Sequence, residues 1–343
     1  MKSQHLPRIQ NRRLSSLTPS GLLASAAALL LTSVVVRAAD APKTALLPEY
    51  HSWTNVVSVN NGLVEALVNP ADGRVQQFRF VGDTNGALWE NPALYGRTPG
   101  NGFGYNNFGG DKAWPSPQSA WGWPPPKGFD GRTNTVSFTN GAVTLVTSVD
   151  PKYKIQVTRN IELLPNQPVM KITTIFERTA ETSLTNNELG VWIDCQAAVS
   201  TDSRCYVPVP SPSIFPNGYT TTGSAQFTTT LPPAFTDTNG LVSFSMPPSG
   251  NQKLGFDGGT LALVGTQLDL RVDAPRVPGA TYPDGNSSTE VYTAQGYFEL
   301  EMLGSLAKLP VGGQMQFVTF YSLFHRTEAT PDAEARKVLS WRY

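Results

Sequence analysis

Alternation of apolar and polar residues, with a period of two, governs almost every readable segment beyond residue 40. Such alternation is typical of strands that bury one face. Clusters of Pro, Gly, Asn and Asp separate these segments and predict turns between antiparallel neighbours. We therefore expect an all-β protein. The predicted strands are residues 63–69, 74–81, 142–149, 153–163, 169–178, 188–195, 260–264, 268–272, 297–303 and 314–325.

One segment has helical character instead. Residues 330–339 predict a short C-terminal helix, with Thr330 as the N-cap and Pro331 at the first helical position. The chain after the leader is about 300 residues long and has no convincing linker, so one large sandwich over residues 39–343 is favoured over two domains.

Residues 1–38 have the pattern of an export signal. Four basic residues precede an uncharged apolar run at residues 21–36, and a small-residue cleavage pattern follows. We expect an exported protein, periplasmic or extracellular in a bacterium. An uncleaved anchor is the alternative, and Arg12 with Arg13 leaves a twin-arginine route open.

The remaining composition excludes several partners. Beyond the leader, 21 Lys and Arg stand against 26 Asp and Glu without a basic cluster, so we expect no nucleic-acid partner. No second apolar run is long enough to span a membrane. Two cysteines and two histidines lie beyond the leader, and the sequence has no phosphate loop or nucleophile elbow. We therefore predict neither a metal nor another cofactor. The sequence does not indicate an oligomeric state.

Residues 106–130 combine three Trp with five Pro and two adjacent Gly. We expect a shaped loop there, and not an ordinary strand, because Pro stiffens the backbone while the Trp faces stay available to a ligand. Asp111 and Lys112 would supply polar contacts, and Trp114 would be the stacking ring. The alternative is a structural loop whose rings plug the core. Residues 207–248 form a second long connection.

Two predicted strands carry polar residues on one face. In residues 188–196, Trp192, Asp194 and Gln196 share a face, and an aromatic ring followed by a carboxylate and an amide suits a sugar. The alternative is a half-exposed outer strand. In residues 297–303, Glu299 and Glu301 share a face about 7 Å apart. Two carboxyl groups this close can have different pKa values, so that one serves as acid and the other as base. Their separation also lies within the range of an inverting glycosidase. The alternative is two glutamates that face solvent.

Other single residues leave two interpretations open. Arg159 interrupts an apolar face, which predicts a structural ion pair or a ligand contact. His325 is a proton donor or a core histidine. Export makes a disulfide between Cys195 and Cys205 possible, and two inert buried thiols are the alternative.

Several longer motifs resemble a known superfamily. NNGLVEALVNPADGRVQQFRFVGDTNGALWEN is similar to the first strands of galactose mutarotase-like (aldose 1-epimerase-like) proteins. FGGDKAWPSPQSAWGWPPPKGFDG, QKLGFDGGTLALVG and YPDGNSSTEVYTAQGYFELEMLGSLAKLPVGG resemble a bacterial family of that superfamily known as a domain of unknown function. The resemblance covers nearly all of the chain beyond the leader.

The resemblance implies a β-supersandwich of two large antiparallel sheets with a sugar-sized cleft. Aldose 1-epimerases of this fold use a glutamate as base and a histidine as acid. Glu301 matches the strand that bears the glutamate, whereas the strand expected to offer the histidine reads NELGVW, without one. Lys112 or His325 would then be the acid, with Glu299 beside the base.

We therefore expect an exported carbohydrate-binding protein. The expected ligand contacts are Asp111, Trp114, Arg159, Trp192, Asp194 and Gln196. If it is an enzyme, it is an epimerase-like isomerase or a glycan-cleaving hydrolase or lyase. The alternatives are a non-catalytic sugar-recognition module of a polysaccharide-degrading system, and a structural envelope protein.

Overall fold

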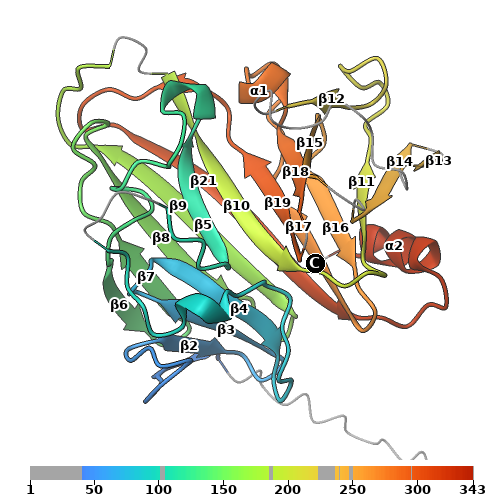
Figure 1. Cartoon of the computed structure of the whole chain (residues 1–343), viewed down its shortest axis with the longest axis horizontal. Helices are drawn as coiled ribbons and strands as arrows, with labels where there is room; N and C mark the ends of the chain where they lie inside the picture. Colours follow the sequence, from blue (N-terminus) through green and yellow to red (C-terminus); the bar gives the residue numbers. More distant parts are fainter. Residues whose placement is uncertain are drawn as a thin grey trace, which may run out of the picture. The chain divides into compact units, whose positions relative to one another are not determined.

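Two large antiparallel sheets make up the protein in a computed structural model (Figure 1). The structure describes residues 41–100, 105–184, 188–222, 236–238, 240–246, 250–294 and 296–342. The predicted leader at residues 1–38 lies outside the described residues. The all-β prediction is confirmed, and every pairing between described strands is antiparallel.

The first sheet has eleven described strands in the order β1-β2-β3-β4-β5-β10-β19-β18-β15-β12, with β20 paired to β10. Their bounds are β1 (Lys43–Leu46), β2 (Val57–Asn60), β3 (Val64–Asn69), β4 (Arg74–Phe80), β5 (Asp111–Ser116), β10 (Glu188–Ala198), β12 (Thr220–Thr221), β15 (Gln252–Phe256), β18 (Thr289–Thr293), β19 (Tyr297–Leu303) and β20 (Ala307–Lys308).

The second sheet has ten described strands in the order β13-β14-β11-β16-β17-β21-β9-β8-β7-β6. Their bounds are β6 (Thr135–Thr139), β7 (Ala142–Val146), β8 (Ile155–Leu163), β9 (Val169–Arg178), β11 (Arg204–Pro208), β13 (Thr236–Thr238), β14 (Leu241–Ser245), β16 (Thr260–Val264), β17 (Leu268–Asp273) and β21 (Gln314–His325).

One large apolar core draws on both sheets. Strand β8 illustrates how it forms, because its nine residues alternate strictly between buried and half-buried positions. Ile155 and Ile161 bury their side chains, and Val191 of β10 and Leu300 of β19 belong to the same core from the first sheet. Period-two patterning therefore directs one face of each sheet inward.

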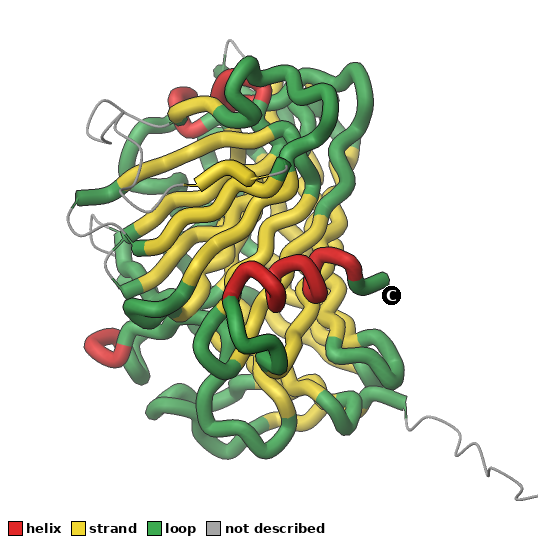
Figure 2. The backbone as a smooth tube through the Cα atoms, turned by 90° about the vertical axis from the view of Figure 1, so that its right-hand side faces the viewer, coloured by secondary structure: helices red, strands yellow, loops and turns green. Residues whose placement is uncertain are grey.

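The predicted C-terminal helix is α2 (Pro331–Ser340), and Thr330 caps it by accepting a hydrogen bond from the amide of Ala333. Helix α2 packs against β16 and β17 and crosses in front of strands in Figure 2. Arg271 of β17 anchors the end of the helix by donating to the carbonyl of Val338. The other helical segments are the short α1 (Pro283–Asn286), η1 (Pro92–Leu94) and η2 (Gln118–Ala120). No helix among the described residues is long and apolar enough to cross a membrane.

The prediction that residues 106–130 lack a strand is wrong, because β5 pairs with β10 along its whole length. Its partner on the other side, β4, pairs only at Asp111. Pro115 therefore lies on the side of β5 that has no partner strand, where its missing N–H costs no hydrogen bond between strands. The carbonyl of Pro115 accepts a hydrogen bond there from the indole of Trp121.

Candidate functional site

A row of charged side chains crosses the first sheet. Lys112 of β5 is opposite Asp194 of β10, which is opposite Glu301 of β19, which is opposite Glu290 of β18. Residues directly opposite each other in antiparallel strands point to the same face. All four side chains are buried, so the sheet itself brings four charges together over four strands.

A second row runs parallel to it, two residues further along the strands. Gln196 of β10 is opposite Glu299 of β19, which is opposite Tyr292 of β18, which is opposite Lys253 of β15. Because the period of a strand is two, this row shares the face of the first. The Nε2 atom of Gln196 donates a hydrogen bond of 2.9 Å to Oε1 of Glu299.

Two lysines neutralise three of the carboxylates. Lys112 Nζ lies 2.6 Å from Asp194 Oδ2, and Lys253 Nζ lies 2.9 Å from Glu290 Oε2 and 2.8 Å from Glu301 Oε2. Buried charges are tolerated when they are paired in this way.

Each ammonium group also faces an indole ring. Lys112 Nζ lies 4.9 Å from the ring centre of Trp114, and Lys253 Nζ lies 4.4 Å from that of Trp192. The rings add cation–π attraction to the ion pairs, so both lysines are held from two sides.

A cavity of about 760 Å³ opens over the second row. Asp194 lies between Trp192 and Gln196 on β10, and both of these neighbours line the cavity, so the charged row runs beside its floor. Glu299 is half-buried and reaches the cavity, whereas Glu301 is buried. The lining residues are Tyr105, Asn107, Trp114, Gln118, Trp123, Trp192, Gln196, Gly250, Asn251, Lys253, Tyr292, Tyr297 and Glu299.

Aromatic rings form much of the cavity wall. Trp123 is 60% exposed, and its ring stands edge-on to Tyr105 with centroids 4.8 Å apart. Trp114 is only 3% exposed and is perpendicular to Trp192 at 5.1 Å. Trp114 therefore has little open surface for the predicted stacking contact, whereas Trp123 offers an open face. Trp121 packs against Trp192.

The environment raises the pKa of the cavity glutamate. Burial and the nearby Asp194 raise the pKa of Glu299 to about 7, while Lys112, Gln196 and Lys253 oppose the shift. Burial also raises the pKa of Glu301 well above its usual range, even though Lys253 opposes this. Near neutral pH, Glu299 is therefore the carboxyl group that can exchange a proton with a bound molecule.

Asp111 and Arg159 lie outside this site, contrary to their predicted role as ligand contacts. Asp111 is opposite Cys195, on the other face of the sheet from Lys112, and its carboxylate forms a buried ion pair with Arg159 of β8. Arg159 also donates to the carbonyl of Asp111 at 3.0 Å, and Tyr321 of β21 donates to the carboxylate. The predicted structural ion pair of Arg159 is the interpretation that the structure supports.

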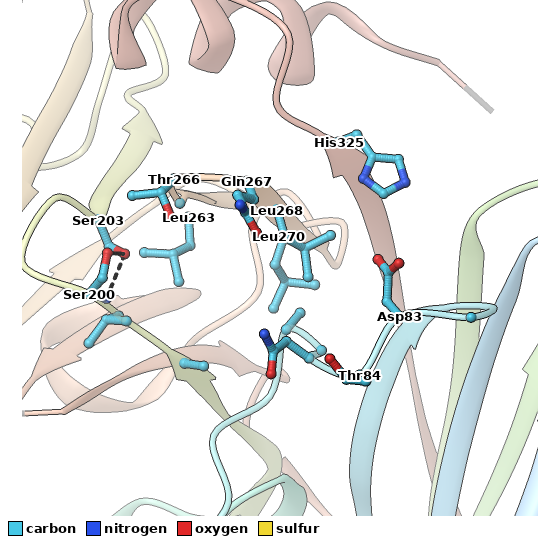
Figure 3. A pocket seen from close by; sticks show the side chains of 17 residues that line it. Asp83, Thr84, Ser200, Ser203, Leu263, Thr266, Gln267, Leu268, Leu270 and His325 are labelled. Carbon is cyan, nitrogen blue, oxygen red and sulfur yellow. Dashed lines mark hydrogen bonds between the residues drawn. The ribbon is translucent and has the colours of Figure 1, made fainter.

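His325 also lies elsewhere, so its predicted role as acid beside Glu301 is not supported. It stacks on Phe80 with ring centres 3.9 Å apart and lines a different cavity of about 650 Å³. Figure 3 shows His325 near Asp83 at one side of that cavity, opposite Ser200 and Ser203. His325 and Glu299 thus belong to separate cavities.

Both cysteines are free and buried, which agrees with the prediction of two inert thiols. Burial is the largest cause that raises the pKa of each thiol, so neither is poised as a nucleophile.

The sequence prediction missed several residues of the site. Lys253 lies on the short strand β15, and Glu290 lies on the short strand β18. Both strands also carry other polar residues, so their sequences provided no clear sign that the two charges would be buried and paired. Tyr105, Asn107, Tyr292 and Tyr297 were missed as well.

The fold and this cavity define an all-β sandwich with a ligand-sized site on one sheet. No protein-family model matches the sequence, and no curated protein matches it. Among solved structures, a candidate aldose 1-epimerase from Klebsiella pneumoniae subsp. pneumoniae matches 87% of this chain over 86% of its own, with a TM-score of 0.53 and 10% identity. A galactose mutarotase related enzyme from Lactobacillus acidophilus matches 79% over 97% of its own, with a TM-score of 0.50 and 9% identity. The chain therefore has the galactose mutarotase-like fold that the sequence resemblance implied.

Proposed function

We propose that this protein binds a carbohydrate in the cavity over β10, β18 and β19. The observation that carries the proposal is the composition of the cavity: the open ring of Trp123 lies on its wall, and Gln196 and Glu299 lie on its floor. A sugar presents apolar C–H faces to aromatic rings and hydroxyl groups to amides and carboxylates. The volume of about 760 Å³ suits a small molecule of this kind.

Proton transfer to the bound sugar is the second candidate function. It is favoured by the pKa of Glu299, which burial and Asp194 raise to about 7, where a carboxyl group serves both as acid and as base. Glu299 then replaces Glu301 as the candidate base, because Glu301 is buried against Lys253. The fold matches a candidate aldose 1-epimerase and a galactose mutarotase related enzyme. This similarity supports an epimerase-like reaction over glycan cleavage.

The acid of such a reaction would be a tyrosine. Tyr105, Tyr292 and Tyr297 line the same cavity as Glu299, whereas His325 does not. Cleavage by a pair of carboxyl groups is disfavoured, since Glu299 and Glu301 do not both reach the cavity.

Export is proposed from residues 1–38 alone, on the basic start and the apolar run at residues 21–36. A periplasmic or extracellular carbohydrate would then be the ligand.

Calorimetric titration of the purified protein with monosaccharides and soluble glycans tests binding. We expect saturable binding of at least one sugar, weakened by Trp123→Ala and unchanged by Glu49→Gln, which alters an exposed glutamate near β1. If no sugar binds at millimolar concentration, the proposal is wrong.

The proposed reaction is tested by using NMR to measure the rate of anomer exchange. Glu299→Gln should slow this exchange about 10²-fold or more.

A further inference from the structure

Two hydrogen-bond acceptors, the carboxylate of Glu299 and the amide oxygen of Gln196, lie on neighbouring strands at the floor of the cavity. Gln196 donates a hydrogen bond from Nε2 to Glu299. The Oε1 atom of Gln196 is buried and has no hydrogen-bond partner among the described residues. Asn107 uses one of its two amide N–H donors on the hydroxyl of Tyr297, at 3.2 Å. The carboxylate of Glu299 and the free oxygen of Gln196 therefore lie together without a cation of their own.

The charges around the cavity are also unequal in number. Asp194, Glu290 and Glu301 use both nearby lysines in their ion pairs. Glu299 has no ion-pair partner within the described part of the chain, and no arginine is among the residues that line the cavity. A ligand that carries a carboxylate or a phosphate would find no free cation there, whereas a positive group would find an unpaired carboxylate.

Aromatic rings surround this acceptor pair and favour a cation further. Tyr292 and Tyr297 line the cavity beside Glu299, and Lys253 over Trp192 demonstrates that rings of this site already hold an ammonium group. A cation–π contact with a desolvated cation raises binding affinity by about tenfold or more. An ammonium group has three donors and no acceptor, which complements the floor.

We propose that the cavity selects sugars that carry an amino group, with the ammonium bound by Glu299 and Gln196 and the ring carbons against Trp123. This inference rests on the proposed carbohydrate function and names the substrate class of the same site. A neutral sugar fills the same aromatic wall but supplies only hydroxyl groups to the acceptors.

Binding of a cation should release a proton from Glu299, whose pKa burial and Asp194 raise to about 7. The charged and titratable groups around it are Lys112 on β5, Asp194 on β10, Glu301 on β19, Glu290 and Tyr292 on β18, Lys253 on β15, and Tyr105 and Tyr297 beside them. An ammonium group next to Glu299 favours its ionised form. Near pH 7, where about half of the molecules hold this proton, the release is measurable.

The experiment compares glucosamine with glucose, and galactosamine with galactose, by titration calorimetry at pH 7 in two buffers that differ in ionisation enthalpy. We expect at least one amino sugar to bind about tenfold more tightly than its neutral counterpart, as a charge-assisted hydrogen bond requires. Glu299→Gln should remove this preference and the part of the proton release that depends on Glu299. Glu49→Gln should leave both unchanged, and circular dichroism establishes that each variant is folded.

The possible failures are distinguishable. If no sugar of either kind binds, the carbohydrate function fails. If neutral sugars bind as tightly as amino sugars, or if Glu299→Gln weakens both members of a pair equally, the carbohydrate function stands and the amino-sugar inference is overturned. If tetramethylammonium binds as tightly as the amino sugars, the site recognises cations without a sugar ring, and the inference is also overturned.

Discussion

Glu299 and Glu301 lie two residues apart on the same face of β19, yet only Glu299 reaches the cavity. Glu301 is fully buried and 2.8 Å from Lys253. One strand thus holds a carboxyl group that is available to a ligand and another that is part of the folded framework. The two should respond differently to substitution.

Lys253→Met should destabilise the protein by about 3–5 kcal/mol, because it leaves Glu290 and Glu301 buried without their cation. Lys171→Met is the matched control, since the ion pair of Lys171 with Glu162 is 33% and 42% exposed and should contribute at most about 1 kcal/mol. Urea unfolding measures both. Equal costs for the two variants would contradict the structural role of Lys253.

Stability should fall as pH rises from about 4 towards 7, in part because of Glu299. The pKa of a glutamate in an unfolded chain is about 4.3, whereas burial and Asp194 raise that of Glu299 to about 7 in the folded protein. The folded state therefore binds the proton more tightly in this interval. The contribution is fully present below pH 4 and is lost as the pH passes through the folded pKa.

Glu299→Gln should remove roughly 1–2 kcal/mol of this fall, less than the full shift implies because the side chain is partly solvated. Urea unfolding of both proteins between pH 4 and 8 measures the difference. Burial also raises the pKa values of Asp72 and Asp269 to about 7, so the comparison with the variant is needed to isolate Glu299. Parallel pH curves for the two proteins would count against the raised pKa.

Asp111→Ala should cost about 3–5 kcal/mol, because it leaves Arg159 and the hydroxyl of Tyr321 without their buried partner. Sugar affinity should stay within about twofold once the variant is folded, since Asp111 lies on the opposite face from the cavity. Unfolding and calorimetry check the two parts separately. A large loss of affinity in a fully folded variant would restore Asp111 to the binding site.

Much of the fold was predictable, because period-two patterning reports directly on which face of a strand is buried. Residues 153–163 alternate in sequence, and β8 alternates in burial. β5 was hidden by Pro115, which is acceptable only because β4 does not pair beside it. Whether a proline faces an edge depends on a strand that comes about forty residues earlier in the chain, and local sequence does not report that.

The site was predictable only on single strands. Period two correctly placed Trp192, Asp194 and Gln196 on one face. It did not reveal that Lys253 would face the same cluster, since that depends on the register of β15 against β18. The sequence also could not predict which of these side chains are exposed to the cavity and which are buried.

Neither thiol should react with a thiol reagent in the native protein, because Cys195 and Cys205 are buried and burial raises their pKa values. Both should react in denaturant without prior reduction. A spectrophotometric thiol assay with and without guanidinium checks this expectation. A requirement for reductant would instead indicate a disulfide.

Trp123 and Trp114 line the same cavity but differ in exposure, so their substitutions should separate binding from stability. Trp123 is 60% exposed and Trp114 is 3% exposed. Trp123→Ala should weaken sugar binding about tenfold, the equivalent of one aromatic contact, and change the free energy of unfolding by less than about 1 kcal/mol. Trp114→Ala should instead lose about 3–5 kcal/mol of stability, because it removes a buried ring from the core. Calorimetry and urea unfolding on both variants provide the four values. If Trp114→Ala left stability intact and abolished binding, Trp114 would be the stacking ring after all, and the open face of Trp123 would have no part in recognition.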